Sequence, residues 1–185
     1  MIDKIAENAG DKMEKSVNLL AQELSKLRTG RASSAIVEGL KVEYYGSALP
    51  LNQVATISIP EPRLIVIQPW DKTALGEIEK AIYKSAIGLT PNNDGSVIRL
   101  SIPPLTTERR EELIKLTQKM GEEAKVAMRN IRRDANNEIK KEEKQKKISE
   151  DESFKAQERI QKITDNYIEK VDEVLGKKIK EIRET

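Results

Sequence analysis

Three arginines in the C-terminal half of the chain have the residue type and the spacing needed to bind phosphate groups. Arg129, Arg132 and Arg133 stand at positions i, i+3 and i+4, which places their side chains on one face of a helix. A planar guanidinium group donates two parallel hydrogen bonds to a phosphate, so arginine suits recognition of a nucleic-acid backbone. We interpret these residues, called here the arginine cluster, as a candidate phosphate-binding site.

The positive charge of the chain is concentrated around this cluster. The whole chain has 33 basic and 31 acidic residues, a formal net charge of +2, so bulk charge alone does not favour nucleic acid. Residues 125–147, in contrast, contain 9 basic and 4 acidic residues. A helical projection at about 100° per residue places five cations opposite the expected apolar stripe, with Asn136 among them: Lys125, Arg129, Arg132, Arg133 and Lys140.

The alternative interpretation is a helix face that is merely solvated. Against it, Arg129 has Lys125 and Arg133 at i−4 and i+4, and these neighbours repel it where a solvated face usually provides acidic partners. No aromatic residue lies between Tyr83 and Phe154, which disfavours the base stacking of single-stranded RNA binders. The pattern therefore predicts salt-sensitive contacts to the backbone of folded or double-stranded RNA.

Other kinds of chemistry have little support. The chain has no Cys and no His, so it lacks a thiolate nucleophile, a disulfide and the commonest general base and metal ligand. No phosphate-binding loop is present. We interpret Asp71 as a helix cap and residues 91–95 as a turn, not a calcium loop. The sequence predicts no catalytic residue, no metal and no cofactor.

The location of the protein is predicted from two further absences. No apolar run approaches the length of a membrane span, and the polar N-terminal residues contain no signal-peptide core. We therefore expect a cytoplasmic protein without membrane contact.

Long amphipathic helices must position the arginine cluster. Apolar residues at spacings of three and four predict a helix over 3–27, a second from Thr106 or Thr107 to about 148, and a third after Ser149, where Glu152 completes a candidate capping box. The predicted stripe of the first contains Ile5, Ala9, Met13, Ser16, Leu20, Leu24 and Leu27. That of the second contains Leu113, Leu116, Met120, Ala124, Ala127, Ile131, Ala135 and Ile139.

The segment between the first two helices differs in composition and predicts mainly strands. Runs rich in β-branched residues predict strands within 36–45, 54–59, 64–70 and 97–102, and one helix is expected over 73–86. The fold class is therefore α+β: an elongated antiparallel three-helix bundle formed by 1–30 and 105–185, with a small mixed α/β domain, 31–104, inserted into it. Two connections at one end form the expected hinge: Thr29, Gly30, Pro103 and Pro104.

Several strings identify a family that the chain resembles. KLRTGRAS at 26–33, VEYYG at 42–46, PLNQVA at 50–55, PPLTTERR at 103–110 and RNIRRDAN at 129–136 are similar to the ribosome recycling factor family, and the similarity covers essentially the whole chain. The resemblance implies an L-shaped monomer of two domains. It also implies binding between the ribosomal subunits after termination, and splitting of that complex with elongation factor G and its GTP hydrolysis.

The resemblance also assigns residues. It implies that Arg129 and Arg132 contact large-subunit ribosomal RNA, and that the smaller domain and the hinge face elongation factor G. Supporting RNA contacts are expected from four further arginines: Arg28, Arg31, Arg110 and Arg133.

Two other function classes fit the rod and its charge. One is a helical adaptor whose basic face binds an acidic protein, and the other is a general RNA chaperone. Salt-dependent binding separates RNA recognition from an apolar adaptor contact, and selectivity for ribosomes separates a recycling factor from a chaperone.

Overall fold

A computed structural model describes all residues from Met1 to Thr185. The chain forms two compact units, one made of Met1–Arg28 with Thr107–Glu184 and the other of Thr29–Thr106 with Thr185. The first unit is helical and the second contains the strands, so the fold is α+β as predicted.

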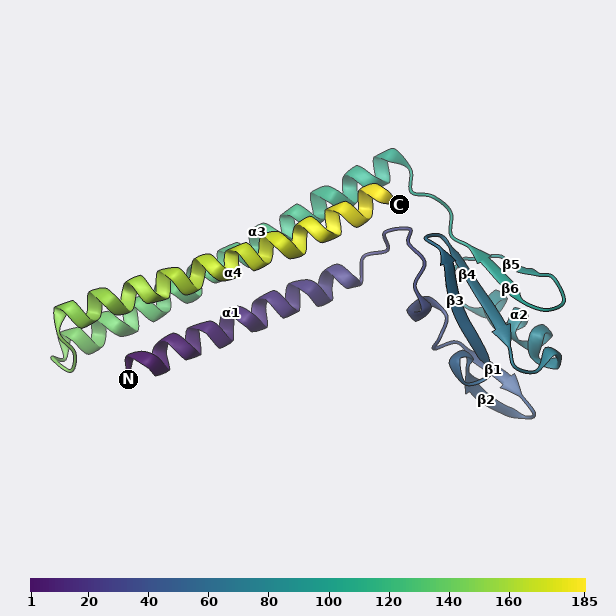
Figure 1. Ribbon diagram of the computed structural model, residues 1–185, viewed down its shortest axis with the longest axis horizontal. Helices are drawn as coiled ribbons and strands as arrows, with labels where there is room; N and C mark the ends of the chain where they lie inside the picture. Colours follow the sequence, from purple (N-terminus) through teal and green to yellow (C-terminus); the bar gives the residue numbers. More distant parts are fainter. The chain divides into compact units, whose positions relative to one another are not determined.

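The helical unit consists of three long helices that lie side by side (Figure 1). They are α1 (Ile2–Ser25), α3 (Thr107–Lys144) and α4 (Glu150–Glu184). At 1.5 Å per residue, α3 is about 57 Å long. The chain reverses direction between α3 and α4, and α1 runs in the same direction as α4, which makes the unit an antiparallel bundle.

The predicted start of the third helix is confirmed in atomic detail. The Ser149 backbone N–H donates to Glu152 Oε2 at 2.8 Å, and the Glu152 backbone N–H donates to Ser149 Oγ at 3.2 Å. Both bonds satisfy N–H groups that a helix start leaves without partners. The same backbone contact lowers the pKa of the Glu152 carboxyl below its usual value.

The bundle core consists of two apolar clusters along the three helices. One gathers around Ile5, Ile139 and Ile160, and the other around Met13 and Met128. Each side chain of this kind contributes roughly 1.5–3 kcal/mol by leaving water. On α1 the predicted stripe is correct except at Ser16, which is only half-buried. Val17 takes that place in the core.

The buried face of α3 is rotated from the predicted one by roughly 50° about the helix axis. Leu116 was expected inside but is 42% exposed, whereas Thr117 and Met128 are fully buried. Thr117 is tolerated there because its hydroxyl donates to the Leu113 carbonyl at 2.8 Å. The rotation moves the residues at 125 and 132 from the solvent face to the edge of the bundle.

On this buried face α3 and α4 approach each other closely at Gly121. A Cβ atom at this position would overlap the side chain of Leu175 on α4. Leu175 is itself 8% exposed and has little room to move. The glycine therefore lets Leu175 of α4 pack directly against the α3 backbone. In helix propensity it is less favourable than alanine by roughly 1 kcal/mol.

The second unit is built on a four-stranded antiparallel sheet with the strand order β3-β4-β6-β5 and a separate β1-β2 hairpin. The strands are β1 (Lys41–Tyr44), β2 (Ser47–Pro50), β3 (Ala55–Glu61), β4 (Leu64–Pro69), β5 (Pro91–Asn93) and β6 (Ile98–Ser101). The sequence patterns do not indicate β2, and of the turn expected over 91–95 the residues Pro91–Asn93 form β5. Each is four residues or fewer and contains a proline, a residue depleted in strands.

One helix, α2 (Leu75–Lys84), covers the core of this unit. Its Ile78 and Ile82 join the apolar cluster that contains Ile65 and Ile98 of the sheet. The predicted cap at Asp71 is confirmed, since its Oδ1 accepts a hydrogen bond of 2.9 Å from the Thr73 backbone N–H at the start of a short 3₁₀ turn that leads into α2.

We expect substitution of Gly121 by alanine to destabilise the bundle. Overpacking against Leu175 should outweigh the gain in helix propensity and lower the free energy of unfolding by about 1–2 kcal/mol. The matched control is Gly176→Ala on α4, where a Cβ meets nothing within 4 Å, and this change should stabilise by up to about 1 kcal/mol. Urea unfolding measures both. Equal effects of the two substitutions would contradict the close approach.

Candidate nucleic-acid interface

Two members of the arginine cluster are free on the surface of α3. The side chains of Arg129 and Arg133 are exposed, and neither forms a hydrogen bond or ion pair within the chain. They stand one helical turn apart, so their guanidinium groups share a face. Two cations left unpaired on one face of a helix are suited to neighbouring phosphates of a nucleic-acid backbone.

The third member lies at the boundary between α3 and α4. Arg132 is half-buried, and its Nη1 donates to Gln161 Oε1 on α4 at 2.9 Å. Gln161 in turn donates from Nε2 to Asp165 Oδ1 at 2.8 Å. The spacing within α3 predicts Arg132 as part of the cluster but does not indicate Gln161 or Asp165, because a contact with another helix depends on the register between the helices.

Lys125 was expected on the solvent face of α3, where it could pair with Glu122, and the structure places it instead at the edge against α4, paired with both Glu122 and Asp172. Its Nζ lies 2.7 Å from Asp172 Oδ1 on α4 and 3.6 Å from Glu122 Oε1, and its side chain is 19% exposed. The hydrogen bond with Asp172 raises the pKa of Lys125 above its usual value. Lys125 therefore contributes to the contact between α3 and α4, and its charge is already compensated.

The three other arginines predicted to contact RNA lie outside the arginine cluster. Arg28 and Arg31 are exposed. Arg110 is half-buried, with its Nε shielded from solvent and without a hydrogen-bond partner. The helical period turns Arg110 about 100° away from Arg129. The structure therefore does not bring Arg110 onto the face that Arg129 and Arg133 share.

The residues predicted to form the hinge are found outside the regular elements. Pro103 and Pro104 are exposed and precede α3, while Thr29 is buried. Gly30 has a φ of +75°, a conformation that favours glycine, and a Cβ there would lie 3.1 Å from Leu105 Cγ. Swinging about this segment stays a prediction.

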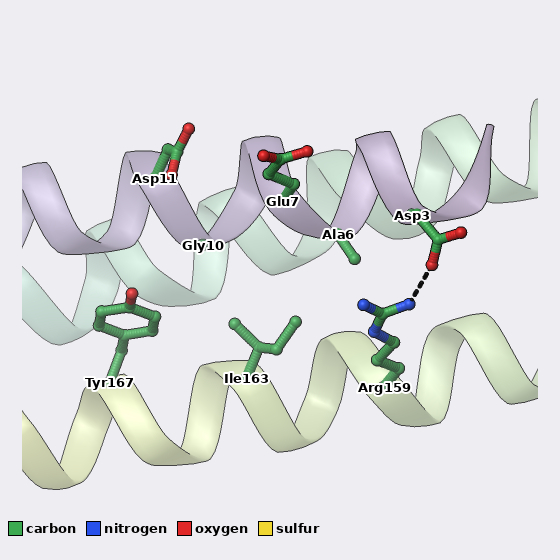
Figure 2. A pocket seen from close by; sticks show the side chains of 8 residues that line it. All are labelled: Asp3, Ala6, Glu7, Gly10, Asp11, Arg159, Ile163 and Tyr167. Atoms are coloured by element: carbon green, nitrogen blue, oxygen red, sulfur yellow. Dashed lines mark hydrogen bonds and ion pairs between the residues drawn. The ribbon is translucent and has the colours of Figure 1, made fainter.

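A groove between α1 and α4 has the opposite charge (Figure 2). Asp3, Glu7 and Asp11 follow one another at intervals of one turn along α1, and Ile163 and Tyr167 of α4 lie across from them. Asp3 is paired with Arg159, which lowers the pKa of its carboxyl. The i, i+4, i+8 spacing of these carboxylates is a signal present in the sequence itself.

The helical unit thus carries cations on one helix and carboxylates along another groove. Such an arrangement lets a polyanion approach α3 and repels it from the groove between α1 and α4. No group of three or more acidic side chains is arranged to hold a metal ion. None of the helices has the length and apolar character required to cross a bilayer.

Comparison with known proteins gives one consistent result. The sequence model of the family described as ribosome recycling factor matches residues 20–182. The ribosome-recycling factor of Natranaerobius thermophilus is 59% identical over 181 residues, which are 98% of either chain. These matches cover both structural units.

Solved structures agree with the sequence comparison. A solution structure of a ribosome recycling factor is similar, with a TM-score of 0.72 and 47% identity, over 100% of this chain and 98% of that one. A second similar structure is the T. thermophilus ribosome recycling factor, bound with E. coli elongation factor G to the E. coli post-termination complex. Its TM-score is 0.62 and its identity 47%, over 98% of both chains.

Lys125 is ion-paired and Arg133 has no partner within the chain, and this difference gives a direct test of the interface. We expect Arg133→Gln to weaken binding to duplex RNA and to reduce the slope of log K against log salt by about 0.9, the contribution of one phosphate contact. The double variant Lys125→Gln/Asp172→Asn removes a compensated pair, so its affinity and slope should match those of the native protein. A salt titration by fluorescence anisotropy measures both. A loss confined to the double variant would contradict this interface.

Proposed function

Because the chain belongs to the ribosome recycling factor family, we propose that it binds the ribosome after termination, between the two subunits. There it splits the complex into subunits together with elongation factor G. The similarity over the full chain supports this proposal, and so does the relative that is bound with elongation factor G to a post-termination complex. We assign GTP hydrolysis to elongation factor G, because this sequence lacks a phosphate-binding loop.

The observation that carries the proposal is the pair of free arginines on α3. Arg129 and Arg133 have no partner within the chain, and Arg132 lies between them in sequence. We propose that these three residues anchor the bundle on large-subunit ribosomal RNA through its phosphates. Arg28, Arg31 and Arg110 are proposed as supporting contacts outside this face.

The charge distribution of the bundle favours one orientation on the RNA. The carboxylates of Glu7 and Asp11, which unlike Asp3 have no partner in the chain, line the groove between α1 and α4, where a phosphate backbone would be repelled. We therefore propose that α3 faces the RNA and that this groove points away from it. A helix of about 57 Å held by two neighbours gives the stiffness needed to transmit a displacement to the subunit contacts.

The connections between the domains are proposed to direct the movement. In this mechanism the domain of residues 31–104 moves relative to the bundle of residues 1–30 and 105–185. The connection at Thr29 and Gly30 bends, and the Pro103–Pro104 connection stays stiff. Elongation factor G acts on the smaller domain and this joint, so the anchored bundle receives the displacement.

The anchor is tested by co-sedimentation with 70S ribosomes at low and high salt. We expect the native protein to bind stoichiometrically at low salt and to dissociate as salt rises. Arg132→Ala should weaken binding tenfold or more, since charge-assisted hydrogen bonds contribute about 1.5–3 kcal/mol each. The matched control is Arg159→Ala, another arginine of the bundle whose partner is Asp3 in the acidic groove, and it should bind as the native protein does.

Three outcomes would overturn parts of this proposal. Equal binding by Arg132→Ala and the native protein would remove the arginine cluster as the anchor. Equal affinity for ribosomes and for unrelated RNAs would favour a general RNA chaperone. No binding to 70S ribosomes at low salt would refute the recycling function and favour a helical adaptor.

The hinge is tested by softening its stiff connection. In Pro103→Gly/Pro104→Gly, two flexible residues replace two that fix the backbone φ angle. We expect ribosome affinity to stay within twofold of native and the rate of subunit splitting with elongation factor G and GTP to fall severalfold. Light scattering follows splitting, and circular dichroism checks the fold. Native splitting rates in this variant would refute the stiff connection.

A further inference from the structure

Two cations of α3 bind α4 along the same edge of the bundle, but their partners differ in charge. Lys125 faces the carboxylate of Asp172 at 2.7 Å. Arg132, seven residues or about two turns later, faces the amide of Gln161 at 2.9 Å. The ammonium is neutralised by its partner, whereas the guanidinium is held by a group without net charge.

The Gln161 amide can bind Arg132 in only one orientation. Its Nε2 donates to Asp165 Oδ1 at 2.8 Å, and its Oε1 accepts from Arg132. Exchanging the amide oxygen and nitrogen would set two donors against each other at Arg132 and two acceptors at Asp165. Asp165 therefore aims the carbonyl of Gln161 at the guanidinium.

The guanidinium of Arg132 keeps most of its binding capacity in this arrangement. It has five N–H donors, and the bond to Gln161 uses one of them. Its position next to α4 restricts a long side chain that would otherwise lose conformational entropy on binding phosphate. Arg132 is thus oriented at the surface with its positive charge intact.

We propose that Gln161 on α4 is a positioning residue for the RNA contact of Arg132, held in its orientation by Asp165. The RNA-binding surface then extends from α3 to the adjacent edge of α4. This inference rests on the proposed function of the arginine cluster. It also gives a reason why Arg132 has an amide partner and Lys125 a carboxylate partner: the charge of Lys125 is compensated by Asp172, so Lys125 does not contribute to RNA binding.

A charge-conserving double variant tests the proposal. Gln161→Glu/Asp165→Asn exchanges the amide and the carboxylate, so the net charge is unchanged and an N–H can still be donated from position 165 to position 161. The negative charge now lies against Arg132. We expect affinity for 70S ribosomes to fall tenfold or more, and the slope of log K against log salt to decrease by about 0.7–0.9. Thermal stability should be unchanged.

Three further variants separate positioning from other effects. Gln161→Met keeps the length but not the hydrogen bond, so affinity should fall a few-fold with an unchanged salt slope. Gln157→Glu adds a carboxylate one turn earlier on α4, where Gln157 is bound to Ser153, and should lose little affinity. Adding Arg132→Ala to the double variant should cause no further loss, because both act through the same guanidinium.

The outcomes distinguish this inference from the proposed function. If Arg132→Ala loses affinity but Gln161→Glu/Asp165→Asn binds as the native protein does, Gln161 has no positioning role and the arginine anchor stands. If the double variant and Gln157→Glu lose affinity equally, the effect is general repulsion and the inference is refuted. If Arg132→Ala itself binds normally, the anchor is refuted first.

Discussion

The packing of α3 against α4, with its close approach at Gly121, leaves only part of α3 in water. Leu175 occupies the space that a side chain at Gly121 would need, and α3 buries Thr117 and Met128. This orientation of α3 brings Lys125 and Arg132 to the edge of α4. Arg129 and Arg133 stay free on the outer face.

The charges of the bundle form two regions with opposite preferences for RNA. The free guanidinium groups of α3 attract phosphate, and the unpaired carboxylates of Glu7 and Asp11 repel it. A rod with only the cations would bind a polyanion in many rotations about its axis. With the acidic groove between α1 and α4, one rotation is favoured, and a force delivered by a partner then acts in a defined direction.

The sequence predicted the helices and the family well, because local signals determine them. Apolar spacing located the three long helices, and Ser149 with Glu152 marked the start of α4 through contacts within one turn. The arginine cluster was found for the same reason, since its spacing lies within one helix.

Features that depend on contacts between helices were predicted less well. Leu116 is exposed, and Lys125 has a partner on α4, Asp172, in addition to Glu122. Both differences from expectation come from the roughly 50° by which the buried face of α3 departs from the predicted one. The Gln161–Arg132 bond joins positions 29 residues apart in sequence, and no pattern in either helix indicates it. The short strands β2 and β5 depend on pairing with their neighbours.

The central claim is that α3 faces ribosomal RNA and the groove between α1 and α4 does not. Since the chain has no cysteine, a hydroxyl-radical source can be attached at a single introduced cysteine. Asn137→Cys lies on α3 one turn after Arg133, and Asn166→Cys lies on α4 along the groove side, both at exposed neutral residues. We predict strong cleavage of large-subunit RNA from position 137 and weak cleavage from position 166. Stronger cleavage from position 166 would contradict the proposed orientation of the bundle.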